Sequence, residues 1–246
     1  MVDELFAQFE GYPARQGYIA RGGQILDASI VPVPHNHDKR AEDASIKADE
    51  TPAGRADKPA KRSQKDVDAR WTRKHGKSHY GYEDHLDVDR KHKLVRRYHV
   101  SPSQDIAWQC PGRGNGCRLT AAAVHDSQAV HQLLTRGNTC SGVRADAAYR
   151  WAGIEAVRKA RKPTSHIQRK GKRGKPLTRQ AWKSKRTKST MRVRVEHIFG
   201  AQTNDIGGTL VRTIGLVKAK ARIWMKTLAY DMRRPGQPGR LNPCPA

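Results

Sequence analysis

The feature that most limits how this chain can fold is a strongly basic stretch between Arg158 and Arg194. It contains sixteen Lys and Arg residues and no Asp or Glu, and the first carboxylate after it is Glu196. Cations this dense repel one another and cannot pack together without a counter-charge. The stretch therefore predicts a polyphosphate partner, and its glycines and proline favour a flexible basic loop over residues 158–194 rather than a helix face.

The charge balance of the whole chain points the same way. Among 246 residues, 48 Lys and Arg stand against 23 Asp and Glu, a formal net charge of +25. Such an excess favours nucleic acid as the partner, with an anionic membrane surface as the rival. No apolar run is as long as a membrane-spanning helix, and the first residues lack a secretory pattern. The chain is therefore expected to be soluble and cytoplasmic, with no membrane partner and no small-molecule substrate.

The cysteines do not form a recognisable zinc motif. Cys110 and Cys117 are separated by six residues, and Cys140 and Cys244 lie far along the chain. Structural zinc sites use closely spaced ligand pairs, commonly with two to four residues between the cysteines. We expect unpaired thiols in a reducing compartment.

Hydrophobic spacing divides the chain into strands and helices. Compact β-branched segments bounded by Gly or Pro predict strands, and apolar residues at helical spacing predict helices. The expected strands are 24–32, 80–88, 93–100, 141–146 and 165–168, and the expected helices are 1–22, one after Asp126, 147–161, 191–201 and 217–233. Residues 34–77 are rich in charge, Ala and Pro, which predicts a charged loop or disordered insertion. The order is that of an α/β fold with a mixed sheet.

Three carboxylates occupy positions suited to metal-dependent phosphate chemistry. Asp27 lies inside one expected strand, Asp146 ends another, and Glu196 lies on a later helix. Ligands of open α/β sheets bind beyond the carboxyl ends of strands, and Mg²⁺ prefers carboxylate oxygens. Each residue also has a structural reading: an Asp beside a turn is often a cap, and Glu196 can pair with Arg192 one helical turn away. Asp126 is better explained as an N-cap.

Five segments, in order along the chain, resemble bacterial insertion-sequence transposases of the DDE class, of the insertion sequence 4 and insertion sequence 5 type. They are Gly-Gly-Gln-Ile-Leu-Asp-Ala-Ser (22–29), Tyr-Gly-Tyr-x-x-His (80–85), Val-His-Asp-Ser-Gln (124–128), Ala-Asp-Ala-Ala-Tyr-Arg (145–150) and Arg-Val-Arg-Val-Glu-His-Ile-Phe-Gly (192–200). The resemblance covers nearly the whole chain.

The resemblance implies a ribonuclease-H-like mixed sheet flanked by helices, within a catalytic domain over residues 23–233. It implies that Asp27, Asp146 and Glu196 are catalytic and bind Mg²⁺ or Mn²⁺. It further implies double-stranded DNA as the partner, at transposon ends and target, for a homo-oligomer associated with the bacterial nucleoid. The residues expected to contact DNA are Arg192, His197, Arg194, Lys183, Lys185, Arg186 and Lys188.

The chain also departs from the family pattern. Ser189 and Thr203 stand where the family has Tyr and Lys, and Glu83 reverses a usual positive charge. Arg144 is foreign as well, and can pair with the aspartate two residues later. Residues 101–120 form an atypical insert without a family counterpart.

The family has a helical N-terminal region that helps to read transposon ends. Here Met1 falls shortly before the first expected catalytic strand, so we expect a truncated reading frame, with a remnant helix over 1–22 and a tail over 234–246.

Three functions stay open at this point. The first is a transposase that cleaves transposon ends and transfers the strand to target DNA. The second is a catalytically inactive DNA-binding remnant, which needs the basic surface but not the carboxylates. The third is a basic RNA-binding protein of the ribosomal kind, which needs no cluster of carboxylates.

The basic stretch generates a prediction about DNA retention. Changing Lys183, Lys185, Arg186 and Lys188 together to Glu should abolish DNA binding at physiological salt, because the cations neutralise phosphates. A logarithmic plot of affinity against salt should lose about 0.9 of slope per lost contact. A gel-shift assay measures both effects, and unchanged retention would contradict the assignment.

Overall fold

The computed structural model describes residues 23–48, 57–74, 76–102, 142–145 and 178–234, with the isolated positions 4, 5, 8, 9, 12, 15, 18, 50, 52, 55 and 133. The strands in these residues are β1 (Gln24–Pro32), β2 (Arg70–Lys74), β3 (Lys77–Asp89), β4 (Val95–Pro102) and β5 (Val143–Arg144). The helices are α2 (Arg40–Lys47), α4 (Pro59–Gln64), α7 (Arg179–Asn204) and α8 (Leu216–Arg233).

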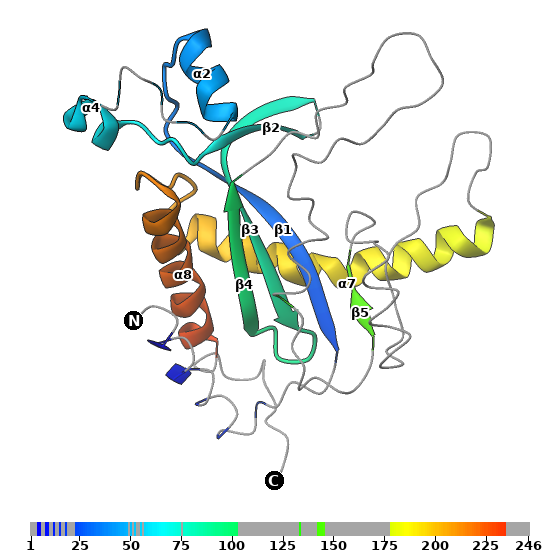
Figure 1. Ribbon diagram of the computed structural model, residues 1–246. Coiled ribbons are helices and arrows are strands. Elements are labelled where there is room, and N and C mark those ends of the chain that lie inside the picture. The colour runs from blue at the N-terminus through cyan, green and yellow to red at the C-terminus, as the bar shows by residue number, and fades with distance from the viewer. Residues whose placement is uncertain are drawn as a thin grey trace, which may run out of the picture.

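The strands form one mixed, curled sheet (Figure 1). Central β3 pairs antiparallel with β1, β2 and β4, whereas β5 pairs parallel with β1 on the opposite edge. Helices α7 and α8 flank this sheet. The expected α/β class with a mixed sheet flanked by helices is therefore confirmed, as are the expected strands at 24–32, 80–88 and 93–100 and the helix at 217–233.

One face of the sheet carries the described core. Ile25 of β1 lies opposite Val88 of β3, and these residues with Leu86 pack against Val195 and Ile198 of α7. All five side chains are fully buried. Successive strand residues point to opposite faces, so the residues at alternate positions from Ile25 along β1 share the face that α7 covers.

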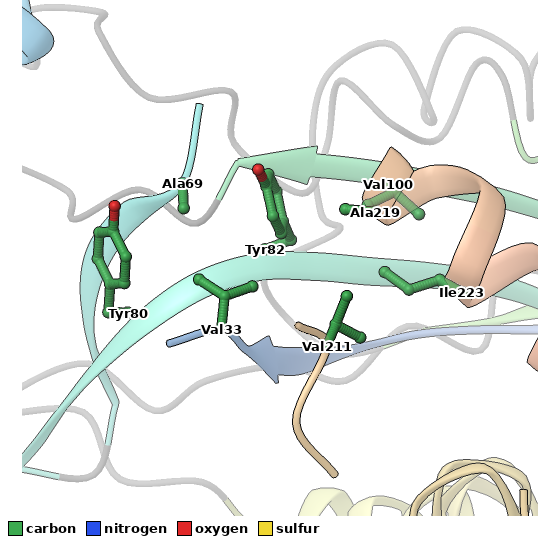
Figure 2. Packing of buried hydrophobic residues seen from close by; sticks show 8 residues of the cluster. All are labelled: Val33, Ala69, Tyr80, Tyr82, Val100, Val211, Ala219 and Ile223. Atoms are coloured by element: carbon green, nitrogen blue, oxygen red, sulfur yellow. The ribbon is translucent and has the colours of Figure 1, made fainter. Parts of the chain in front are cut away.

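A second cluster joins α8 to the curled end of the sheet (Figure 2). Tyr82 and Val100 of the sheet pack near Ala219 and Ile223 of α8, and Val211 approaches from the segment before that helix. Val211 N also donates to the Pro32 carbonyl at 3.0 Å, which fixes this segment at the end of β1.

The segment 34–77 corrects one expectation. Where we expected a charged loop or disordered insertion, the described residues include α2, α4 and β2. The segment folds through ion pairs rather than through an apolar stripe. Buried Arg55 contacts Asp38 and lies 3.7 Å from Glu42, and Lys61 Nζ lies 3.1 Å from Glu42. A hydrogen bond from the Lys39 backbone, followed by one from Lys61, lowers the pKa of Glu42 to about 2.

The segment is also tied to the sheet by Asp66. Its carboxylate accepts the Tyr82 hydroxyl at 2.7 Å and the Ala69 amide at 3.1 Å, so it orients the chain entering β2. Hydrophobic spacing cannot reveal such a segment, because its stabilising contacts are between charged groups.

The expected basic loop is likewise corrected over its described part. Residues 179–194 belong to α7, which begins after Thr178, whose hydroxyl accepts the Ala181 amide at 3.3 Å. Lys, Arg, Gln and Ala are good helix formers, and neither Gly nor Pro interrupts the helix before Gly200. Burial of its C-terminal half supplies the anchor from which the basic half extends into solvent.

Other expected elements lie outside the described residues. These are most of the helix at 1–22, the helix after Asp126, the helix at 147–161, the strand at 165–168, the insert beyond residue 102, the basic residues before 178 and the tail after 234. Within the described ranges, no helix is both long enough and apolar enough to span a membrane.

The close antiparallel pairing of β1 with β3 at Gly81 generates a stability prediction. A Cβ on Gly81 would lie 2.1 Å from the Val31 carbonyl oxygen, which is backbone and cannot move aside. Gly81→Ala should lower the free energy of unfolding by roughly 3 kcal/mol. Gly200→Ala is the control: nothing lies within 4 Å of its Cβ position, so it should raise stability by up to about 1 kcal/mol. Urea unfolding measures the free energy of unfolding of both variants. Equal effects would contradict the close approach of Gly81 to the Val31 carbonyl oxygen.

Candidate active site

Asp27 lies on the sheet face that α7 covers. It is two residues after Ile25 in β1, and its register partner in β3 is the buried Leu86. The side chain is 7% exposed, and its Oδ1 accepts the Ala28 amide at 3.1 Å. The strand therefore holds this carboxylate at the boundary between the sheet and the helix layer.

Strand β5 lies beside β1 in the parallel direction. Gln24 pairs with Val143 and Ile25 pairs with Arg144, and Ala145, the next residue, is 1% exposed. Asp146 itself lies outside the described residues. Of the expected strand at 141–146, the structure describes residues 142–145 and has a strand only over Val143–Arg144.

Glu196 lies on α7 between two residues that anchor the helix. Val195 and Ile198 are fully buried against the sheet, whereas Glu196 and His197 are exposed. At about 100° per residue, Glu196 and His197 lie roughly 130° to either side of the direction midway between Val195 and Ile198, so both project from the exposed side of the helix. Glu196 is therefore on the helix packed over the strand of Asp27, and His197 faces solvent.

The described residues thus bring together the elements of two predicted carboxylates, Asp27 and Glu196. Among them, no group of three or more His, Cys, Asp or Glu side chains is arranged to hold a metal ion. Because Asp146 is not described, the expected triad is incomplete in this set.

The predicted DNA-binding residues of α7 differ in solvent exposure and in the contacts that they make. Lys183 and Arg186 are exposed on its basic half. The side chains of Lys185, Lys188 and Arg192 lie outside the described atoms. Arg194 is half-buried, and its Nη1 donates to the Arg90 carbonyl at 2.9 Å. The basic half of α7 is therefore an exposed cationic surface. Arg194, in the other half of the helix, instead contacts the turn at the end of β3.

Sequence reasoning missed a gathering of arginines around that turn. Burial, followed by the positive charges of Arg90 and Arg194, lowers the pKa of Arg144. The Arg144 Nη1 atom is buried and has no hydrogen-bond partner in the part of the chain that the structure describes. Arg144 and Arg194 stood out singly in the sequence, but their meeting with Arg90 did not, because the three arginines are far apart along the chain and meet only in the fold.

Sequence reasoning also missed a buried carboxylate. Asp84 of β3 is 1% exposed, and neither carboxylate oxygen has a hydrogen-bond partner. It lines a cavity of about 20 Å³ with Ser29, Gln202 and Lys226, large enough for one water molecule. Burial raises the pKa of Asp84 to about 7, despite the opposing positive charge of Lys226. Alternation along β3 was the available signal, since Asp84 lies two residues from both Tyr82 and Leu86.

The β2–β3 hairpin is a second exposed basic surface. Arg73, Lys74 and Lys77 are exposed, and Trp71 beside them is 38% exposed. The Trp71 ring contacts His35 with ring centroids 4.2 Å apart, which holds it in place on the hairpin.

Comparison with known proteins shows which class of protein this chain is similar to. Residues 115–232 match the family model described as the transposase DDE domain. The matched stretch includes β5, Asp146, Glu196 and nearly all of α8, whereas Asp27 precedes it.

A curated relative is more specific. The chain is 24% identical over 212 residues to the transposase for insertion sequence element IS1106 of Neisseria meningitidis serogroup B. The match covers 85% of this chain and 63% of the relative's length. Both matches are to insertion-sequence DDE transposases, and the chain is similar to them over these stretches. No solved structure matches it.

The setting of Asp84 generates a pH prediction. Because its pKa is about 7 in the folded chain and near 3.8 when unfolded, the unfolded state loses its proton first. The free energy of unfolding should therefore fall as pH rises from about 4 to about 7, by roughly a few kcal/mol, and stay level above that range.

Asp84→Asn should remove this decline, and the exposed Asp57→Asn should keep it. Urea unfolding at several pH values measures the difference. A decline of equal size in Asp84→Asn would show that another group causes it.

Proposed function

We propose that this chain is the catalytic core of a DNA transposase, which uses a divalent metal to cleave phosphodiester bonds at transposon ends and transfers the freed strand into target DNA. The β1–β5 register is the observation that carries the proposal. Ile25 lies opposite Arg144, and Asp27 and Asp146 each follow by two residues. Residues two apart in a strand share a face, so continuation of this register favours neighbouring carboxylates beneath α7.

The packing of α7 supports Glu196 as the third metal-binding carboxylate. Val195 and Ile198 are buried against the cluster that contains Ile25, so Glu196 lies on a helix fixed over β1. The mixed sheet with this helix across it also supports the ribonuclease-H-like fold that the resemblance implies.

The donor set suits Mg²⁺ or Mn²⁺. Asp27, Asp146 and Glu196 would hold the ion through carboxylate oxygens, which are the ligands that these hard cations prefer. When bound, such an ion polarises the phosphodiester and lowers the pKa of the attacking water or 3′-hydroxyl. Strand β1 keeps Asp27 in position, so the protein would provide orientation rather than covalent chemistry.

The basic surfaces supply DNA binding. Exposed Lys183 and Arg186 extend from the same helix that carries Glu196, so DNA held along α7 would run toward the carboxylates. Arg192, one helical turn before Glu196, is assigned to phosphates near the cut. His197 faces solvent and is assigned to DNA that approaches from outside. Since two transposon ends require two catalytic centres, we include a homo-oligomer assembled on nucleoid DNA in the proposal.

A second candidate is a DNA-binding protein without catalytic activity. The observation that favours it is Arg144, which places a positive charge two residues before Asp146 in the sequence. That charge weakens the binding of a metal cation nearby.

Single substitutions of the carboxylates separate the two candidates. Asp27→Asn, Asp146→Asn and Glu196→Gln should each reduce Mg²⁺- or Mn²⁺-dependent nicking of transposon-end DNA by roughly 100-fold or more, because each removes charge at the reacting phosphate. DNA retention in a gel-shift assay should not fall, since none of the three contributes positive charge.

The exposed Asp57→Asn is the matched control and should nick like the unmodified chain. If the unmodified chain binds DNA but never nicks it with either metal, the inactive candidate is correct.

A further inference from the structure

Three arginines from three elements meet where β1 and β5 begin. Arg90 belongs to the turn after β3, and its amide donates to the Gly23 carbonyl at 3.0 Å. Arg144 of β5 lies opposite Ile25 of β1, and Ile25 is two residues after Gly23. Arg194 of α7 reaches the same turn through its hydrogen bond of 2.9 Å to the Arg90 carbonyl. The backbone pairing of β1 therefore places all three near the start of β1 and β5, and Figure 1 shows β5 beside α7.

These arginines lie next to the proposed catalytic carboxylates. Paired residues in neighbouring strands project to the same face, so Arg144 shares the α7-covered face with Ile25. Asp27 is on this face as well, one strand repeat, or roughly 7 Å, beyond Ile25. The arginine cluster and the carboxylates are thus neighbours under one helix.

Among the residues that the structure describes, no carboxylate forms an ion pair with these arginines. Arg90, Arg144 and Arg194 are all half-buried, and the Arg144 Nη1 is buried without a hydrogen-bond partner. A buried guanidinium nitrogen without an acceptor costs free energy, and like charges close together add to that cost. A bound oxyanion would remove both costs. Guanidinium groups match phosphate in shape and donate two parallel hydrogen bonds to it.

We propose that Arg144, together with Arg90 and Arg194, binds one phosphate group of the DNA strand beside the metal-binding carboxylates. The inference rests on the proposed function for the identity of the anion, a DNA phosphodiester. The site holds a phosphate near the reacting one rather than the reacting one itself. In this role Arg144, which is foreign to the family pattern, is a positioning residue.

Inorganic phosphate tests the site without metal or DNA. For the unmodified chain, the midpoint temperature of unfolding should rise with phosphate and then level off, at constant ionic strength, as expected for a ligand that binds the folded state. Arg144→Gln should lose this saturable rise. In dilute buffer its midpoint should not fall below that of the unmodified chain, because the substitution relieves repulsion.

The exposed Arg212→Gln is the matched control, since it removes the same charge elsewhere. It should retain the saturable rise. Arg144→Lys covers the case in which Arg144→Gln fails to fold: it keeps the charge but loses the paired donors, so its phosphate response should be weaker. A full response in Arg144→Gln, or in Arg144→Lys if that alone folds, overturns the proposal.

A second experiment with DNA identifies the source of the phosphate group. A short duplex should compete with inorganic phosphate for the site. Arg144→Gln should bind this duplex roughly tenfold more weakly, as for a lost charged hydrogen bond, with the salt slope reduced by about 0.9. A saturable phosphate response that the duplex leaves unchanged would assign the site to free phosphate and overturn the proposal for DNA.

The two proposals fail in different ways. If Asp27→Asn nicks DNA normally, the proposed catalytic function is wrong whatever the phosphate response. If nicking depends on Asp27 but Arg144→Gln behaves like Arg212→Gln with both inorganic phosphate and the duplex, only the proposal for the arginine site is wrong.

Discussion

The packing of α7 across the sheet is the contact on which the rest of the site depends. Val195 and Ile198 are fully buried against the cluster that includes Ile25 and Leu86. This one interface sets the rotation of the helix, and therefore where Glu196, His197 and Arg194 point. It also supports the long basic half of α7, which has no apolar face of its own to bury. Loss of this packing would separate the basic half of α7 from the strand that carries Asp27.

Charge is distributed unevenly around that interface. The N-terminal half of α7 is exposed and cationic, and Arg90, Arg144 and Arg194 form a half-buried cluster. Strands β1 and β3 contribute the carboxylates Asp27 and Asp84 to the face that α7 covers. Such an arrangement is costly in an empty protein, because like charges are close and buried polar atoms lack partners. A phosphate polymer with its metal ions would neutralise both signs. The cost of the folded state is thus consistent with a protein built to bind a charged ligand.

Sequence patterns predicted the regular core and missed the parts held by charge. Strand β1 was evident because Ile25 and Ile30 are flanked by glycine and proline, and α8 because its buried residues recur at helical spacing. The ion-pair network around Arg55 has no periodic signature, so α2 and α4 were not expected. In α7, the high helix propensity of Lys and Arg and anchoring at Val195 outweighed the repulsion that suggested a loop. The candidate carboxylates came from motifs, since neither Asp27 nor Glu196 is distinctive by position alone.

The sequence by itself determined the chemical inventory: a large excess of cations, carboxylates at three motif positions, and strands and helices in α/β order. These properties are local, because they depend on residue type and on spacing within a single element. Only the tertiary structure decided that β5 runs parallel beside β1, that Asp84 has no partner, and that Arg90, Arg144 and Arg194 share one place. Those outcomes depend on register and helix rotation, which are set by contacts between residues far apart in the chain.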